Sequence, residues 1–378
     1  MFVAIANDLF GGIWHYVVPF LLLITPIVFF HELGHFLMAR AFGVRIETFS
    51  IGFGPEIFGW NDRKGTRWKV SWIPLGGYVK FFGDLNAASA PDREQLEGLS
   101  ANEREGAFPF KPLYQRALVV AAGPVANFVL AIVILASFLM VFGTYVALPV
   151  VDKIIPGGAA AQAGFHVGDT ILSVNGQKVS RFDELQDLIW GHPGDLLSVV
   201  VSRPAGSVLL HVTPRLTSLK LVGGIQKVGL LGIDGPPQAK WSHVSYGPIG
   251  ATTQACRDVW SIVATTFEHL GRIVISKDKP SELSGVIGIA KLSGDVAAIS
   301  FLELFKLAAL ISVSVGLVNL FPIPILDGGH LLYYGVEAAL GRPLGARAQD
   351  VGFRLGLAVM LGLMLLAAWN DLVRLNLF

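Results

Sequence analysis

Two histidines and a glutamate form the group in this sequence that is best suited to chemistry. His31-Glu32-Leu33-Gly34-His35 matches the short pattern of a zinc protease motif. Residues four apart share one face of a helix, so His31 and His35 can present imidazoles to one metal ion while Glu32 stands beside water at that ion. The motif therefore predicts a site for one Zn²⁺ ion, with Glu32 as the catalytic residue.

The motif lies at the end of an uncharged run that reaches back to Leu9. A soluble zinc protease carries such a motif on an amphipathic helix, whereas the turns before His31 offer only apolar faces. Ionisable residues inside a membrane span are costly and therefore usually functional. The sequence thus places the predicted zinc site inside a membrane.

A zinc site that keeps one position open for water needs a third protein ligand, and Asp327 is our candidate. It lies in the segment 319–328, where Pro322 and Pro324 would break a helix. Irregular backbone at membrane depth is tolerated where it lines an enclosed or watery cavity. The break therefore suggests a site.

Alternatives exist for each of these assignments. Asp327 could cap a helix end near the membrane interface. Glu56 follows His35 at a distance reminiscent of soluble zinc proteases, but the glycines around it and Pro55 deny it a helix. His330 lies one helical turn beyond Asp327 and either supports a ligand or is incidental. The remaining histidines are interpreted as ordinary surface or interface residues: His15, His166, His192, His211, His243 and His269.

The composition is that of a polytopic membrane protein, since 53% of the residues are hydrophobic and only 15% are charged. A net charge of +1 provides no basic field, which argues against nucleic acid as a partner. Cys256 is the only cysteine, so neither an internal disulfide nor a cysteine-based zinc site can form. The N-terminal apolar run is too long for a signal peptide and lacks its basic segment, so we expect it to be retained.

Four stretches are long enough, or nearly so, to cross a hydrocarbon core that needs roughly 20 apolar residues: residues 9–38, 117–142, 307–326 and 355–370. No Lys or Arg precedes the first stretch, whereas the segment between the first two is rich in both. The positive-inside rule puts that segment in the cytoplasm and the long segment between the second and third spans outside. The first and third spans then run parallel. His31 follows Leu9 by about 22 residues, and Asp327 follows Leu307 by about 20 residues. Both side chains are therefore expected at a similar depth near the cytoplasmic face.

The extramembrane segments contain two regions with recognisable patterns. Residues 44–49 and 67–72 alternate polar and apolar side chains, which predicts strands. These strands form either a small cytoplasmic sheet or a membrane-dipping hairpin whose edge could pair with an extended substrate. Residues 241–275 show helical apolar spacing, which fits an amphipathic helix on the outer membrane surface or one packed on the neighbouring domain.

A separate α+β domain is expected at residues 145–216. Pro156-Gly157-Gly158 and the following small residues, then Val167-Gly168-Asp169 through Asn175-Gly176, resemble the central turn, short helix and strand of a PDZ domain. Residues 182–190 would form the groove helix, and residues 196–202 and 207–213 the closing strands. Such a groove binds a chain end or an extended peptide, or the domain only excludes bulky proteins from the membrane site.

Taken together, these motifs resemble the site-2 protease family of intramembrane metalloproteases, of the bacterial type that cleaves anti-sigma factors. The resemblance covers His31–His35, Ala122-Gly123-Pro124-Val125-Ala126-Asn127, the PDZ-like insert, Gly288-Ile289-Ala290 and the segment 319–328. It implies zinc ligands at His31, His35 and Asp327, a catalytic Glu32, and substrate binding by Asn319 with Pro322 and Pro324. Gly123, Pro124 and Asn127 are expected to shape the second span and hydrogen-bond to a neighbouring helix rather than perform chemistry. The chain departs from the family in its single PDZ-like module and in Val286, where proline would be more typical.

We therefore expect a polytopic α-helical membrane protein with four transmembrane helices, a membrane-associated β-hairpin or sheet and an inserted α+β PDZ domain. The expected segments are a first span with the zinc motif (1–43), the β region (44–83), a cytoplasmic loop (84–116), a second span (117–142), the PDZ domain (145–216), an outer linker with the amphipathic helix (217–300), a third span with the proline-containing motif (301–328), and a cytoplasmic turn with the fourth span (329–378).

The expected function is zinc-dependent endopeptidase cleavage of single-span membrane proteins in a bacterial inner membrane. An anti-sigma factor already trimmed on its outer side is the substrate that the family implies, and remnant signal peptides are a second possibility. The N-terminus and the PDZ domain would lie outside, with the lipid bilayer and a peptide or chain end in the PDZ groove as partners. A non-catalytic PDZ-bearing scaffold and a metal transporter or sensor are the alternatives, and the glutamate beside the ligands favours hydrolysis over both.

Overall fold

The computed structural model describes residues 2–83, 98–221, 224–237, 241–274 and 285–374, which form two compact units. The first unit comprises Met1–Ala136, Thr252–Thr266 and Pro280–Phe378, and the second comprises Ser137–Ala251 and Phe267–Lys279. All of the candidate metal ligands therefore belong to the first unit. The larger part of the expected loop, residues 84–97, lies outside the described residues.

Four helices of the described chain are long and apolar enough to cross a membrane. They are α1 (Phe2–Ala41), α4 (Leu113–Phe142), α9 (Phe301–Asn319) and α11 (Ala346–Arg374). The expectation of four apolar spanning helices is thus confirmed as far as length and composition can show.

The helices of the last two spans differ in extent from the apolar stretches at 307–326 and 355–370. Helix α9 ends at Asn319, well before residue 326, because Pro322 and Pro324 cannot continue a helical hydrogen-bond ladder and the residue before a proline avoids helical geometry. Helix α11 extends beyond the predicted 355–370 at both ends.

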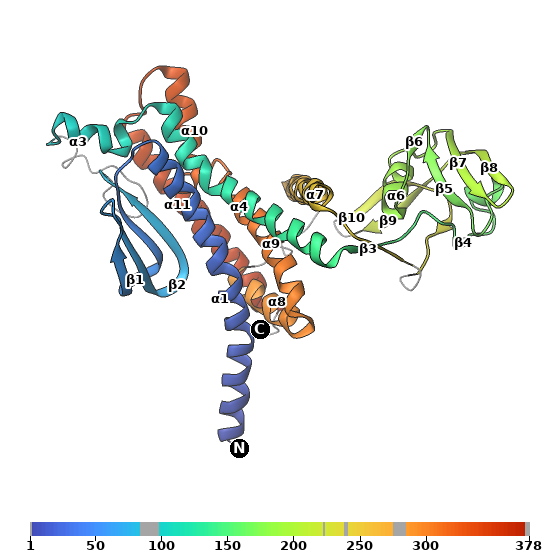
Figure 1. Cartoon of the computed structure of the whole chain (residues 1–378), viewed down its shortest axis with the longest axis horizontal. Coiled ribbons are helices and arrows are strands. Elements are labelled where there is room, and N and C mark those ends of the chain that lie inside the picture. Colours follow the sequence, from blue (N-terminus) through green and yellow to red (C-terminus); the bar gives the residue numbers. More distant parts are fainter. Residues whose placement is uncertain (1, 84–97, 222–223, 238–240, 275–284, 375–378) are drawn as a thin grey trace. The chain divides into compact units, whose positions relative to one another are not determined.

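The spanning helices α1, α4 and α9 of the first unit lie close together (Figure 1), and small and branched residues pack between them. Leu23 and Ile27 of α1 share a buried cluster with Leu307 and Ile311 of α9. Helices α1 and α4 approach each other closely at Gly34, where a Cβ atom would lie 2.2 Å from the carbonyl oxygen of Ala122. Only a glycine permits this approach, which brings α4 alongside the zinc motif.

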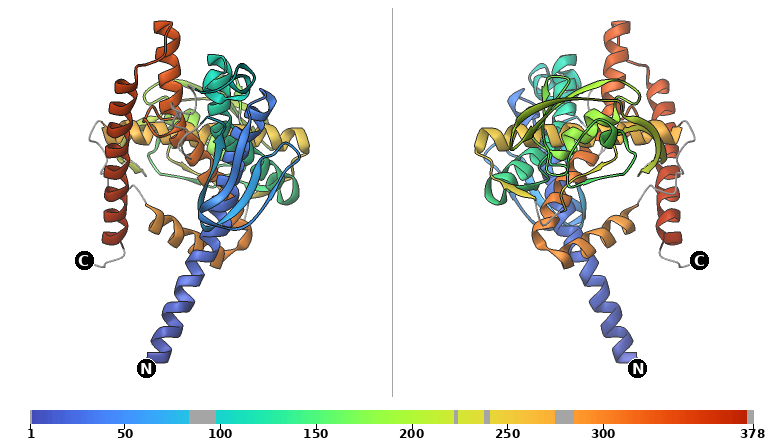
Figure 2. Two further views of the ribbon diagram at one scale, coloured as in Figure 1. Left: turned by 90° about the vertical axis from the view of Figure 1, so that its left-hand side faces the viewer. Right: turned by 90° about the vertical axis from the view of Figure 1, so that its right-hand side faces the viewer.

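A sheet formed by β1 (Ile46–Asn61) and β2 (Arg67–Phe81) packs against α1, as Figure 1 and the two side views in Figure 2 show. Residues 48–51 pair with residues 77–80 and also with residues 67–70. Phe49 is fully buried in the core between sheet and helix, where it stacks on Trp68 with ring centroids 4.3 Å apart. Both strands extend well beyond the predicted 44–49 and 67–72, and residues 77–81 form an outer edge of the sheet.

The end of α1 is tied to the turn that joins the two strands. Arg40 forms an ion pair with Asp62, whose other oxygen accepts hydrogen bonds from the backbone N–H groups of Lys64 and Thr66. Burial raises the pKa of Asp62, but the hydrogen bonds from Arg40, Thr66 and Lys64 outweigh it and lower this pKa to about 2. The carboxylate therefore stays ionised and holds the sheet at one end of α1.

The shorter helices of the first unit include α3 (Ala101–Gly106), the 3₁₀ helix η1 (Phe108–Phe110), α8 (Val286–Ile299) and α10 (Asp327–Leu340). The buried Asp371 of α11 accepts hydrogen bonds from the backbone N–H groups of Gly285 (3.1 Å) and Gly288 (2.9 Å). A carboxylate at this position satisfies donors that the first turn of a helix leaves unpaired. Asp371 therefore fixes the start of α8 to α11.

The second unit is built around a four-stranded antiparallel sheet with the strand order β6-β5-β7-β8. Its strands are β5 (Thr170–Val174), β6 (Gln177–Lys178), β7 (Leu197–Arg203) and β8 (Gly206–Val212), with helices α5 (Ala159–Gln162) and α6 (Phe182–Trp190). The predictions of a helix at 182–190 and of the two closing strands are confirmed to within one residue at each end. The core contains Ile171, Leu185 and Val199, each almost fully buried.

This unit continues past the predicted boundary at residue 216. Leu231 belongs to the same core, and β11 (Ile233–Asp234) pairs with β4 (Lys153–Ile154), so residues far beyond 216 complete the unit. Strand β12 (Ser242–Val244) likewise pairs with β3 (Thr144–Val146), and the remaining hairpin is β9 (Arg215–Leu221) with β10 (Gly224–Leu230). The amphipathic helix expected at 241–275 is α7 (Pro248–Val274), because residues 242–244 are taken up by β12.

Candidate metal centre

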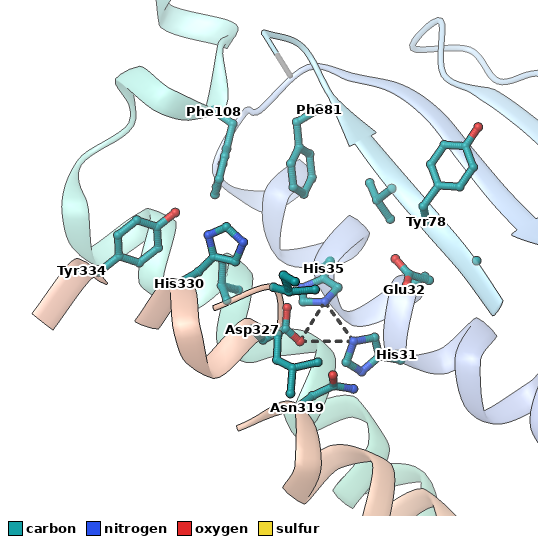
Figure 3. A pocket seen from close by; sticks show the side chains of 15 residues that line it. His31, Glu32, His35, Tyr78, Phe81, Phe108, Asn319, Asp327, His330 and Tyr334 are labelled. Carbon is teal, nitrogen blue, oxygen red and sulfur yellow. Dashed lines mark hydrogen bonds and ion pairs between the residues drawn. The ribbon is translucent and has the colours of Figure 1, made fainter. Parts of the chain in front are cut away.

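Three side chains from opposite ends of the chain converge beside α1. His31 and His35 lie on one face of that helix, with their Nε2 atoms 3.3 Å apart. Oδ2 of Asp327, the first residue of α10, lies 3.2 Å from Nε2 of His31 and 3.4 Å from Nε2 of His35 (Figure 3). One ligand atom from each residue thus falls within 4.8 Å of the other two, and the structure brings the three predicted ligands together.

The chain reaches Asp327 through the broken segment that the prolines predicted. Ile325 has a φ of 106°, a backbone conformation that a β-branched residue rarely adopts. A Cβ atom at Gly328 would lie 2.2 Å from the carbonyl oxygen of Phe321, so only glycine lets α10 begin against the segment that precedes it. A strained backbone conformation of this kind persists only where the surrounding structure holds it. Here the strained segment directs the carboxylate of Asp327 towards the two imidazoles.

Helix α10 is also held to α4 away from this turn. Arg116, in the first turn of α4, donates hydrogen bonds of 2.5 and 3.3 Å to the two carboxylate oxygens of Glu337. The guanidinium lies 4.9 Å from the ring centroid of Tyr334. Both charged side chains are about 15% exposed, so the pair is largely removed from water and fixes α10 relative to α4.

The protonation of His35 follows from its second ring nitrogen. Nδ1 lies 2.9 Å from the carbonyl oxygen of Val119, which can only accept a hydrogen bond, so Nδ1 carries the proton and Nε2 of the neutral ring carries a lone pair. That lone pair faces Oδ2 of Asp327, a buried oxygen without a hydrogen-bond partner among the described residues. Lone pairs that converge with no proton between them repel unless a cation lies among them. Two imidazoles and a carboxylate are also the donor set that zinc prefers, so the residues present fit a zinc ion.

Glu32 lies next to these ligands without being part of the cluster. In Figure 3 its carboxylate lies between the cluster and β2. A Cβ atom at Gly77 would be 3.2 Å from Cγ of Glu32 and 2.7 Å from the carbonyl oxygen of Ser50, so glycine at this position lets the edge of the sheet reach the glutamate. Glu32 is thus placed to exchange protons with a molecule bound between α1 and β2.

The ligands and Glu32 line one cavity of about 210 Å³. The edge segment of β2 forms one wall and the broken segment before α10 another. Asn319 and His330 contribute polar side chains, whereas Pro322 and Pro324 are not among the residues that line it. The full lining is His31, Glu32, His35, Gly77, Tyr78, Val79, Phe81, Phe108, Val120, Asn319, Ile325, Leu326, Asp327, His330 and Tyr334.

The residues expected to shape the second span lie directly behind the ligands. Gly123 faces the ring of His35, and the carbonyl oxygen of Pro124 would be 3.0 Å from a Cβ atom at Gly316 of α9. Asn127 is fully buried, and its amide nitrogen lies 3.2 Å from Nδ1 of His31. The side chain of Asn127 therefore lies within hydrogen-bond distance of the neighbouring helix α1.

Sequence reasoning missed two parts of the site. The backbone carbonyl of Val119, which accepts the hydrogen bond from His35, cannot be recognised in the sequence, because every residue has the same backbone carbonyl. The edge segment 77–81 lay within the predicted β region at 44–83 but outside its predicted strands, although the alternation of Tyr78 and Lys80 with Val79 and Phe81 could have extended the strand at 67–72. The alternative ligand Glu56 forms an ion pair with Arg67 on β2 and is not among the residues that line the cavity.

Comparisons with known proteins found a matching family and several similar chains. Residues 19–363 match the family described as Peptidase family M50. Metalloprotease MmpA of Caulobacter vibrioides is 41% identical over 384 residues, covering 96% of each chain. Two further relatives are provisionally named zinc metalloproteases. The protein from Rhizobium meliloti is 44% identical over 94% of this chain and 96% of its own, and the protein from Agrobacterium fabrum is 42% identical over 96% of this chain and 97% of its own. Among solved structures, the PDZ domain of an SdrC-like protein from Listeria monocytogenes matches with 22% identity over 24% of this chain and 90% of that one, and its TM-score of 0.19 is too low to establish a shared fold.

Proposed function

The chain belongs to peptidase family M50 and is a zinc metalloprotease, and we propose that it cleaves single-span membrane proteins within or near their transmembrane helices. The observation that carries the proposal is the convergence of His31, His35 and Asp327 beside Glu32. These residues lie on or next to helices that are apolar enough to span a membrane, so a substrate reaches them from the lipid.

We assign His31, His35 and Asp327 as the ligands of one zinc ion. A zinc ion held there would supply a Lewis acid, which would polarise a peptide carbonyl and lower the pKa of water so that water can lose a proton and attack at neutral pH. Glu32 takes the proton from the attacking water and passes it to the leaving amine. Its placement beside the ligands, and not among them, supports this role.

The substrate must be extended to enter the cavity. A transmembrane helix buries its amides in internal hydrogen bonds, so the segment to be cut has to unwind first. Within the described chain, residues 77–81 pair only with β1. Since Gly77, Tyr78, Val79 and Phe81 also line the cavity, an unwound substrate can add to this edge as a further strand. Asn319, on the opposite wall, would bind the substrate backbone, while Pro322 and Pro324 hold the chain open between α9 and α10.

The proposed topology follows from the charges that flank the spans. The basic segment between α1 and α4 lies in the cytoplasm, so the N-terminus and the second unit lie outside a bacterial inner membrane and the zinc site lies near the cytoplasmic face. We propose that the second unit is a PDZ domain, supported by its four-stranded sheet, helix α6 and the glycine-rich turns before them. Its groove would take a peptide or a new chain end, or the unit would exclude bulky proteins.

The substrate class that fits this arrangement is a single-span protein already trimmed on its outer side, such as an anti-sigma factor, with remnant signal peptides as a second class. We propose no nucleic acid among the partners, because the small net charge of the chain provides no basic field to attract one. A trimmed substrate would expose the chain end that a PDZ groove accepts.

The Glu32→Gln variant tests the proposal. Membrane proteomes of cells that carry the native or the Glu32→Gln protein should differ by single-span fragments that accumulate uncut with the variant, while the purified variant still binds zinc. Glu56→Gln is the matched control, because Glu56 is paired with Arg67 outside the cavity lining and should leave cleavage unchanged. Full cleavage by the Glu32→Gln protein would refute the proposed mechanism.

A further inference from the structure

Asn127 is aimed at one of the proposed zinc ligands. Its side chain is fully buried on α4, with the amide nitrogen 3.2 Å from Nδ1 of His31 and the amide oxygen without a hydrogen-bond partner among the described residues. Ser312 of α9 donates a 2.9 Å hydrogen bond to the backbone carbonyl of Asn127. A Cβ atom at Gly316 would lie 3.2 Å from Cβ of Asn127, so α9 packs tightly behind the side chain and keeps it directed at His31.

The two ring nitrogens of His31 have to serve different partners. Nε2 faces Oδ2 of Asp327 at 3.2 Å and Nε2 of His35 at 3.3 Å, so it must be free of a proton to bind a metal ion. A neutral imidazole carries one proton, which must then sit on Nδ1. Nδ1–H needs an acceptor, and the Asn127 side chain is the neighbour that the structure places beside it.

An amide nitrogen cannot accept that proton, whereas the amide oxygen can. The two ends of a carboxamide have nearly the same shape and exchange places by a half-turn of the side chain. The half-turn costs the amide oxygen no hydrogen bond, because it has none among the residues described. It places this oxygen where the amide nitrogen lay, so that Nδ1–H of His31 can donate a hydrogen bond to it. A metal ion at Nε2 therefore selects the orientation in which the oxygen faces His31.

We infer that Asn127 is a positioning residue, whose carboxamide oxygen accepts the Nδ1–H of His31 and so holds Nε2 of that ring unprotonated towards Asp327 and His35. The carbonyl of Val119 does the same for His35 at 2.9 Å. Acceptors behind a metal-binding histidine fix its tautomer and orientation, and their loss weakens metal binding by about 10- to 100-fold. The inference rests on the proposed zinc protease site.

The test compares three variants of the full-length protein in detergent. Asn127→Leu keeps the size but removes the acceptor, Asn127→Asp offers only acceptor oxygens, and Ser312→Ala disturbs the same helix contact without touching the carboxamide. Zinc affinity is measured by competition with a chromophoric chelator, and the ligand geometry by the visible absorption of the Co²⁺-substituted protein. The apparent melting temperature in excess chelator reports folding without the metal.

We expect Asn127→Leu to bind zinc on the order of 10- to 100-fold more weakly and to change the Co²⁺ spectrum. Asn127→Asp should stay within a few-fold of the native affinity, and Ser312→Ala within about twofold. If the leucine variant does not fold, Asn127→Ala, which needs no additional space, replaces it.

Two results would overturn the inference. One is native zinc affinity in Asn127→Leu or Asn127→Ala. The other is a loss in Asn127→Asp as large as that in Asn127→Leu, as helix packing alone would give. Failure of the proposed function looks different, because the native protein would then bind no zinc or the Glu32→Gln variant would still cleave.

Discussion

Gly123 lies against the ring of His35 so closely that a Cβ atom there would be 2.2 Å from Nε2 and 2.5 Å from Cε1. Nε2 is the atom of His35 that faces both Asp327 and His31. The second spanning helix therefore lies directly against this imidazole, with no space for a side chain at position 123.

Gly123→Ala should displace the His35 ring. We expect zinc affinity and peptidase activity to fall at least tenfold, with an overpacking cost of about 1–3 kcal/mol in stability. Chelator competition and a cleavage assay measure the two losses. Gly362→Ala on α11, where the added Cβ would have no neighbour within 4 Å, is the control and should retain native zinc binding. Native zinc affinity in Gly123→Ala would contradict the close contact.

Removal of zinc should lower the melting temperature, because the ligands come from α1 and α10 and form one site only in the folded protein. Zinc at a thousandfold excess over its Kd contributes about 4 kcal/mol to stability. Thermal unfolding with chelator, and after zinc is restored, measures the shift. Glu32→Gln should show the same shift as the native protein, and Asp327→Ala little or none. A shift in Asp327→Ala as large as the native one would remove Asp327 from the ligand set.

Gly77→Ala should separate catalysis from metal binding. The added Cβ would lie 2.7 Å from the carbonyl oxygen of Ser50 and 3.2 Å from Cγ of Glu32, so the edge of the sheet must move away from the glutamate. A displacement of about 1 Å at a reacting centre can cost up to 100-fold in rate, so we expect kcat to fall at least tenfold. Zinc content should stay native, since none of the three atoms nearest to the added Cβ belongs to a proposed zinc ligand. Equal losses of zinc and activity would argue against a separate substrate-binding edge.

The second unit should lose stability in acid through Asp169, which is 2% exposed and forms hydrogen bonds with Arg203 at 2.7 and 2.8 Å. Burial raises the pKa of this carboxyl, but the Arg203 side chain and the His166 backbone N–H lower it more, so the pKa lies below its usual value. The lowered pKa contributes stability that is fully present above the unfolded value of about 3.9 and is lost as the pH falls through the folded value.

Asp169→Asn leaves Arg203 without its charged partner and should lower the melting temperature of the second unit at pH 7. The native and variant melting temperatures should approach each other as the pH falls below about 4. Calorimetry of the full-length protein in detergent, from pH 7 down to the acid transition, measures both effects. A difference that stays constant with pH would show that ionisation of Asp169 contributes nothing.

Local patterns in the sequence were sufficient for the parts of the site that depend on neighbouring residues. The spacing of His31 and His35 places both rings on one face of any helix. Pro322 and Pro324 end the third spanning helix wherever it packs, because they lack backbone donors. The helix at 182–190 and the strands after it follow from their own periodicity, and the structure has them within a residue of the predicted bounds.

Contacts between distant segments were decided by the tertiary structure. The edge of β2 reaches Glu32 only because the strand folds back along β1 and Gly77 admits the approach. Val119 and Asn127 face the two histidines because Gly34 lets α4 cross α1 closely. Composition and spacing therefore determined which residues could bind a metal in a membrane. The packing of helices far apart in the chain decided which hydrogen bonds orient those residues, because such bonds depend on distances that no local pattern encodes.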